Sequence, residues 1–156
     1  MKHYLNFLLI AMVVSFVACD KNKNEPQKAN FFEDESIRTQ GLMTVKLDDT
    51  TNFEYSIDSV IFSFDKEYVK IDMKKVKFSP QMPISLDMTI DSVAYYIDNN
   101  DEAILSGNNI VPKALGGPFP QYTITNLSGK CGFNYEFTMM CGKYPVEYQG
   151  GILLTK

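Results

Sequence analysis

The chain has 156 residues, of which 45% are hydrophobic and 22% are charged, and its formal net charge is −4. This length and composition indicate one globular domain with a sizeable core. The balance is acidic and no basic patch stands out in the sequence, which argues against nucleic acid as a partner.

The first 18 residues have the pattern of a secretory signal. A charged start is followed by a nearly unbroken apolar run from Leu5 to Ala18. This run is shorter than the roughly 20 apolar residues that a helix needs to span a bilayer. It ends in "FVAC", which resembles a bacterial lipobox, with Phe16 at the position where Leu is usual. We therefore expect residues 1–18 to be removed and Cys19 to become the first residue of the mature chain.

Cys19 is the predicted lipidation site, because a lipobox cysteine takes a diacylglycerol on its thiol and the new amine can then be acylated. Two or three acyl chains, at about 0.8 kcal/mol per buried CH₂, are sufficient for stable anchoring. The alternative is a weak N-terminal helix that ends in a buried free cysteine. Residues 19–35, rich in Lys, Asn, Glu and Gln, predict a flexible tether between this anchor and the domain.

Residues 36–156 predict a single all-β domain. Apolar and polar residues alternate without error from Ile84 to Ile90, as in a half-buried antiparallel strand. The apolar parity slips within Phe53–Phe64 and again between Met73 and Val76, and each slip predicts a bulge or a strand break. Strands are expected at Leu42–Leu47, Phe53–Phe64, Tyr68–Phe78, Ile84–Ile90, Ala103–Ser106, Gln121–Leu127, Phe133–Met139 and Val146–Leu154.

About eight short strands joined by polar turns fit a small closed barrel or a sandwich. We favour a small antiparallel up-and-down barrel, because closure removes exposed strand edges. Eight strands give an interior that side chains can fill or that can hold one small apolar ligand. The sequence leaves this choice open, although an aromatic stripe is more often core than pocket. The residues expected to line the interior include Phe62, Met88, Phe137 and Tyr148.

The segment from residue 107 to residue 121, "GNNIVPKALGGPFPQ", is the longest break in the alternation within the domain. It holds three prolines and three glycines, and the "GGP" within it cannot sit inside a central strand. One interpretation is a rigid plug that closes a barrel end with Val111, Leu115 and Phe119. The other is a lid in which Phe119 and Tyr122 contact a ligand. The prolines favour the plug.

Cys131 and Cys141 invite a disulfide, because they form an even pair in an exported chain. If residues 132–140 form one straight strand, however, the two backbones lie roughly 33 Å apart, whereas a disulfide tolerates about 7 Å. Both cysteines share the parity of the apolar positions between them. We therefore predict two small, buried and unreactive thiols.

The sequence offers no catalytic residue, metal site or cofactor motif. The only histidine, His3, leaves with the signal, which excludes His-dependent triads and His-ligated zinc from the mature chain. No phosphate loop or dinucleotide fingerprint occurs. "DNNDE" at residues 98–102 begins like a calcium loop but has Ala103 and Asn109 where the loop needs glycine and an acidic residue. A solvated turn is the preferred interpretation, while a pair of carboxylates brought together by folding stays open.

Three short patterns resemble an O-glycosylation signal of exported proteins. "IDSV" occurs twice, with Ser59 and Ser92 as its hydroxyl residues, and "DTT" contains Thr50. The signal has the order Asp, hydroxyl residue, then a small or apolar residue. The alternative is that Ser in a β-branched run simply suits a strand end or a bulge.

Several segments together resemble a known family. The lipobox, the polar tether, "GLMTVKL", "VKFSPQMPISLDMTI", "GNNIVPKALGGPFPQYTITNLSG" and the final "YPVEYQGGILL" are similar to the calycin-like β-barrel lipoproteins of Bacteroidetes. The resemblance implies a lipocalin-related barrel anchored to the outer membrane in the cell envelope. The face of that membrane stays open, and the family has no established activity to carry over.

Two functions therefore remain, and they differ in the use of the barrel interior. The first is a non-enzymatic interaction or structural component of the envelope that docks on another envelope protein or a glycan. The alternative is a barrel of lipocalin type that holds a small apolar ligand. We favour the first because aromatic residues inside a barrel usually form its core.

Overall fold

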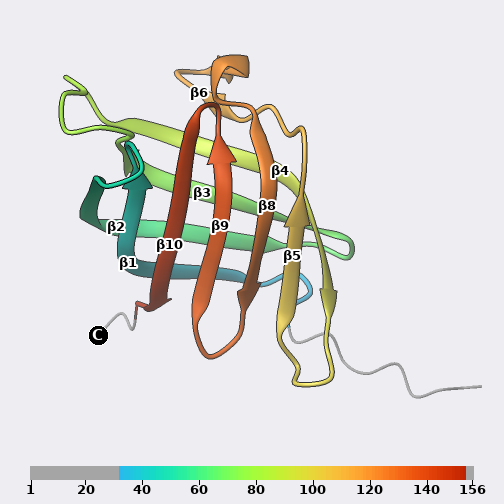
Figure 1. Cartoon of the computed structure of the whole chain (residues 1–156). Helices are drawn as coiled ribbons and strands as arrows, with labels where there is room; N and C mark the ends of the chain where they lie inside the picture. The colour runs from blue at the N-terminus through green and yellow to red at the C-terminus, as the bar shows by residue number, and fades with distance from the viewer. Residues whose placement is uncertain (1–31, 154–156) are drawn as a thin grey trace, which may run out of the picture.

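The computed structural model describes residues 32–153, and these form a closed antiparallel barrel. The eight barrel strands are β1 (Ser36–Lys46), β2 (Asn52–Phe64), β3 (Tyr68–Val76), β4 (Leu86–Ile97), β5 (Ala103–Gly107), β8 (Ile124–Cys131), β9 (Tyr135–Cys141) and β10 (Tyr144–Ile152). Each strand pairs with the next one in this order, and β10 pairs with β1 to close the ring (Figure 1). The predicted all-β, up-and-down barrel of eight strands is confirmed.

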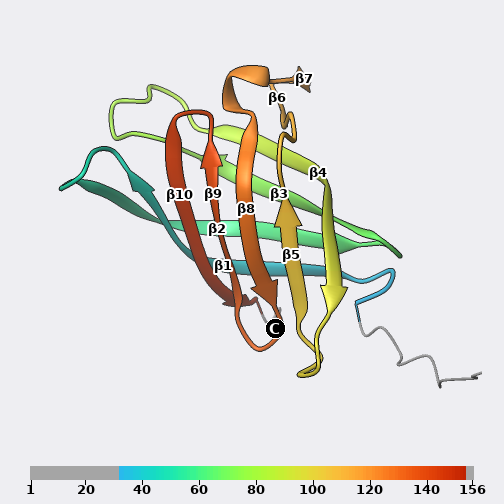
Figure 2. The same cartoon turned by 45° about the vertical axis from the view of Figure 1, so that its right-hand side comes forward.

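The barrel is flattened into two layers whose strands cross steeply. In Figures 1 and 2, β5, β8, β9 and β10 stand side by side in one layer, and β2 and β3 run across behind them. Strand β1 bends from the rear layer into the front one. Gly41 lies at a register shift of β1, and a Cβ built there would stand 2.1 Å from the carbonyl oxygen of Gln149 on β10. Only glycine allows β1 and β10 to approach this closely.

Bulges occur where the sequence predicted slips and at two further places. On β2, Ser59 and the residue before it together lie opposite a single residue of β1. On β3, the pairing with β4 shifts at Lys75, whose φ is 57°. These confirm the two predicted slips. Ser92 on β4 and Asn126 on β8 mark the other two shifts, with φ of 58° and 54°. At both places the spacing of the buried apolar residues also changes from two to three, from Ile90 to Val93 and from Ile124 to Leu127.

Large side chains occupy the barrel interior. Phe62 is fully buried, and its ring centroid lies 5.2 Å from that of Tyr135, 6.3 Å from Phe137 and 6.4 Å from Tyr148. The Tyr148 hydroxyl lies 2.7 Å from Thr39 Oγ1, which donates its own hydrogen to the carbonyl oxygen of Val60. Tyr148 must therefore be the donor to Thr39. All four residues predicted to line the interior are buried: Phe62, Met88, Phe137 and Tyr148.

The segment between β5 and β8 forms a short structured excursion at one end of the barrel. Its β6 (Lys113–Ala114) pairs with β4, its β7 (Gly117–Pro118) pairs with β6, and the 3-10 helix η1 (Pro120–Tyr122) leads into β8. Pro118 has no N–H to donate and stands in an edge strand, where proline is tolerated. Val111 and Leu115 are 44% and 72% exposed. Their predicted part in a plug is wrong.

Four stacked aromatic rings, here called the aromatic stack, cover that end of the barrel. Phe78, from the loop between β3 and β4, is buried at its centre. Its ring centroid lies 4.7 Å from that of Tyr122 and 5.6 Å from that of Tyr144, and Phe119 stacks on Tyr122 at 5.0 Å. The residue that plugs the barrel is therefore Phe78, with half-buried Phe119 outermost in the stack.

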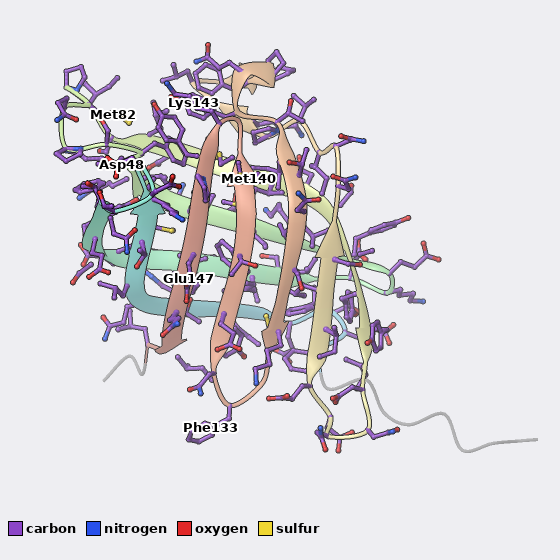
Figure 3. All side chains as sticks on the ribbon, viewed as in Figure 1. Asp48, Met82, Phe133, Met140, Lys143 and Glu147 are labelled. Carbon is purple, nitrogen blue, oxygen red and sulfur yellow. The ribbon has the colours of Figure 1, made fainter. Side chains whose placement is uncertain are left out.

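Three predicted strand starts lie outside the strands, and one of them is Gln121, which belongs to the 3-10 helix η1 that precedes β8. Ile84 precedes β4 and is exposed, because the strand begins only at Leu86. Phe133 is 93% exposed at the tip of the turn between β8 and β9 (Figure 3), where Gly132 N–H donates to the carbonyl oxygen of Asn134 at 3.1 Å. Both residues continue an alternating run in parity but lie outside the ladder. Parity alone cannot distinguish a strand residue from an adjoining turn residue.

Both cysteines are free and buried, as predicted. Cys131 ends β8 and lies opposite Tyr135, whereas Cys141 ends β9 and lies opposite Ile124. The length of β9 therefore separates the two thiols. Burial raises the pKa of the Cys131 thiol, and it raises that of Cys141 to about 12. Neither thiol is a nucleophile near neutral pH, because the reactive species is the thiolate.

We expect alkaline pH to destabilise the barrel. A thiol in the unfolded chain ionises near pH 8.5, whereas the folded pKa of Cys141 is about 12. Because the thiol of the unfolded chain releases its proton at lower pH, the contribution of the buried thiol to the free energy of unfolding is fully present below about pH 8.5. This contribution is lost as the pH rises toward 12. Urea unfolding between pH 7 and 11 measures this, and Cys141→Ala should flatten the curve. A free energy of unfolding that is constant over this range would contradict the burial of the thiols.

Candidate functional site

The outward-facing side chains of β1, β10, β9 and β8 enclose a surface groove, here called the outer groove. Its main part has a volume of about 620 Å³ and is lined from Lys46 and Asn52 at one end to Asn126 at the other. A second recess of about 380 Å³ continues it and shares Thr138 and Glu147 with it. Figure 3 shows Glu147 and Met140 on the outer surface of this layer.

The strand register places a row of polar side chains across the middle of the groove. Thr44 on β1 lies opposite Glu147 on β10, Glu147 lies opposite Thr138 on β9, and Thr138 lies opposite Ser128 on β8. Adjacent strands are about 4.8 Å apart, so the row is roughly 14 Å long. Three of its four side chains end in a hydroxyl close to the backbone. This row, here called the hydroxyl row, lies between the two recesses, and its Thr138 and Glu147 line both of them.

Longer side chains flank the hydroxyl row. On one side, Pro145 lies opposite Met140, with Lys46 at the end of β1 beside them. On the other side, Gln149 lies opposite Glu136, and Glu136 lies opposite Lys130. The first set lines the main recess and the second set lines the second recess. The outer groove therefore follows the direction of the strands, and the hydroxyl row crosses its middle.

The charges in the groove largely offset one another. Lys130 Nζ lies 3.7 Å from Glu136 and 3.9 Å from Glu102. Glu147 Oε1 accepts a 2.6 Å hydrogen bond from Gln149 Nε2, which orients the carboxylate. Lys46 and Asp49, of opposite charge, both line the main recess. The groove thus presents hydroxyls, an amide and one central carboxylate, and its electrostatic potential is not strongly positive or negative.

The opposite face of the barrel pairs its own charges instead. On β3 and β4, Lys70 lies 3.0 Å from Asp72 and Lys74 lies 3.2 Å from Asp87. Thr89 Oγ1 donates to Asp72 at 2.5 Å. Although partial burial opposes it, these hydrogen bonds from Thr89 and Lys70 lower the pKa of Asp72. The charged side chains of this face already have partners within the protein, so the outer groove is the better candidate site.

The residues predicted from the sequence are scattered, and only one of them lines the outer groove. That residue is Thr50, whose N–H and Oγ1 both donate to Asp48 Oδ1, at 2.9 and 3.0 Å. Phe119 and Tyr122 belong to the aromatic stack and do not line the groove. Cys19 lies outside the described residues.

The two "IDSV" serines both lie at bulges, which agrees with the structural interpretation of that pattern. Ser92 is exposed, so its hydroxyl is open to modification. Ser59 is only 3% exposed, and its Oγ has no hydrogen-bond partner among residues 32–153. A glycan on Ser59 would require attachment before folding.

Sequence reasoning missed Glu147, Thr138 and Thr44. Their outward direction follows from the alternation, since each is polar between buried neighbours. Their alignment in one row depends on how β1, β10, β9 and β8 pair, and β1 and β10 come from opposite ends of the domain. Register over such a sequence separation is not visible in the sequence.

Comparison with protein-family models, with curated proteins and with solved structures finds no match for this chain. Within residues 32–153, no helix is long and apolar enough to span a membrane. Over the same residues, no three His, Cys, Asp or Glu side chains are grouped to hold a metal ion. Asp98 of the "DNNDE" segment instead accepts hydrogen bonds from the N–H groups of Asn100 and Glu102, at 2.8 and 3.0 Å.

Proposed function

We propose that this protein is an envelope-anchored, non-enzymatic binding module that contacts its partner through the outer groove. The packing of the interior carries this proposal. Phe62, Phe137 and Tyr148 fill the barrel with mutually contacting rings, and the aromatic stack covers one end. The filled interior counts against the alternative of a small apolar ligand held inside. A partner must then bind on the outside, where the groove offers a recess of about 620 Å³.

Within residues 32–153 the two thiols are poor nucleophiles, which supports a non-enzymatic role. The mature chain has no histidine, because His3 belongs to the signal. The two described thiols are buried, and burial raises the pKa of each. Glu147 and Glu136 do line the neighbouring recesses, but Glu136 lies within 3.7 Å of Lys130. The groove is therefore better suited to binding than to acid–base chemistry.

The lipobox and the resemblance to calycin-like lipoproteins of Bacteroidetes support the anchor. Twelve residues lie between Cys19 and Phe32, and the thirteen steps from one to the other span at most about 45 Å. Phe32 is fixed in the barrel by its ring contact with Phe64, at 4.8 Å between centroids. The domain is thereby held near the outer membrane. Digestion of intact cells with an added protease would assign it to the outer or the periplasmic face.

We expect Cys19→Ala to block anchoring. Without the thiol, no diacylglycerol can be attached, so the precursor should keep residues 1–18 and incorporate no labelled fatty acid in its native host. Cys131→Ala is the matched control, because it removes a buried thiol and should leave labelling unchanged. Mass spectrometry of the N-terminus gives the result. Efficient cleavage before residue 19 in the Cys19→Ala variant would contradict the assignment.

Photo-crosslinking in the native host tests the groove. A diazirine amino acid replaces Thr138 in the hydroxyl row, or Lys74 on the opposite face as a control. The proposal predicts a specific adduct, protein or glycan, from position 138 and none from position 74. Equal or absent adducts from the two positions would remove the outer groove as the contact site.

A further inference from the structure

We infer that the outer groove binds a neutral oligosaccharide, which forms hydrogen bonds to the hydroxyl row at the middle of the groove. This inference rests on the proposed function, since it names the ligand of the same site. Thr44, Thr138 and Ser128 can each donate one hydrogen bond and accept two, and the carboxylate of Glu147 accepts only. A sugar ring presents hydroxyls that both donate and accept, which matches this mixture.

Glu147 is the central group in this recognition. Its carboxylate is already oriented by Gln149 Nε2 at 2.6 Å through one oxygen, Oε1. The carboxylate has about four acceptor sites in all, so most of them are left for a ligand. Hydrogen bonds from sugar hydroxyls to a carboxylate are charge-assisted and are roughly twice as strong as neutral ones.

The charge pattern favours a neutral ligand over a charged one. An anionic chain lying in the outer groove would place its charges beside Glu147, which lines both recesses. A cationic chain would meet Lys46 at one part of the lining and Lys130 at another. A neutral chain avoids both penalties and still uses the charged groups as hydrogen-bonding partners. Met140 and Pro145 add an apolar wall against which the C–H faces of sugar rings can lie.

The closed barrel also argues against a peptide. Extended peptides are commonly held by adding a strand to a free sheet edge. Strands β1, β8, β9 and β10 each pair with a neighbour on both sides. A peptide lying over these strands would have to pair its backbone N–H and C=O groups with side chains alone. An oligosaccharide has no backbone groups of this kind and needs no free strand edge.

A glycan array and calorimetry on the domain without its lipid, residues 20–156, test the inference. The array carries neutral α- and β-linked hexose and pentose oligomers, with uronic-acid and sulfated oligomers for comparison. We expect saturable binding to a neutral oligomer. Glu147→Gln, which keeps the size of the side chain, should weaken binding at least 10-fold, and Thr138→Val should weaken it several-fold. Lys74→Gln, on the opposite face, is the control and should leave the affinity unchanged.

Three results would overturn the inference. One is that no neutral oligomer binds, another is that only charged oligomers bind, and the third is equal affinity of wild type and Glu147→Gln. Circular dichroism and the urea midpoint of each variant establish that a loss of binding is not a loss of folding. The crosslinking at Thr138 separates the two proposals. A protein adduct there without glycan binding would leave the groove as the contact site and reject the oligosaccharide.

Discussion

Phe62→Ala should lower the free energy of unfolding by about 3 to 5 kcal/mol, the cost of truncating a buried aromatic residue. The Phe62 ring lies at the centre of the barrel and contacts the rings of Tyr135, Phe137 and Tyr148. Because residues from several strands meet there, the surrounding structure cannot collapse fully into the space left by the ring. Chemical denaturation of the domain without its lipid measures the loss.

Phe133→Ala is the matched control for this substitution. It removes the same ring from a turn tip where the side chain is 93% exposed, so stability should change by about 0.5 kcal/mol or less. A loss below about 1 kcal/mol for Phe62→Ala, with an unchanged denaturant slope, would mean that the interior is loosely filled. The apolar-ligand alternative would then become the better proposal.

Phe78→Ala should cost a similar amount, about 3 to 5 kcal/mol. The ring is buried at the centre of the aromatic stack, and its removal leaves Tyr122 and Tyr144 without their shared neighbour. Burial raises the pKa of Tyr122, so phenol ionisation reports on the same change. Spectrophotometric titration of the Phe78→Ala variant should show part of the tyrosine absorbance titrating at lower pH than in wild type.

Phe119→Ala separates the plug from the outer part of the stack. Phe119 is only half-buried and contacts one ring of the stack, Tyr122, so the expected loss is about 1 to 2 kcal/mol. This lies between the values for a full plug and for a free lid. If Phe119→Ala proved as costly as Phe78→Ala, the end of the barrel would be closed by both residues.

Much of the barrel was predictable from alternation and its interruptions. The period of two located the strands, and the parity slips near Ser59 and Lys75 marked two bulges that the structure contains. The apolar positions within the runs also identified the interior correctly, because in an antiparallel barrel one face of every strand is buried. These properties depend on neighbours along the chain, which a sequence displays directly.

The remaining features depend on contacts between distant segments. Phe78 was expected at the end of a strand but plugs the barrel from a loop, where it meets Tyr122 and Tyr144. The hydroxyl row joins Thr44 of β1 to Ser128 of β8 through two intervening strands. No local pattern encodes such a meeting, because it arises from the register of strands that are far apart in sequence.

Native mass spectrometry of the protein isolated from its own host tests the central claim most directly, namely that the interior is filled and the partner binds outside. The account predicts that the mass equals that of the polypeptide with its covalent modifications, with no apolar molecule retained after gentle ionisation. One apolar molecule retained per chain and released only on unfolding, at a lower yield in a Phe62→Ala variant, would contradict it and place the ligand inside the barrel.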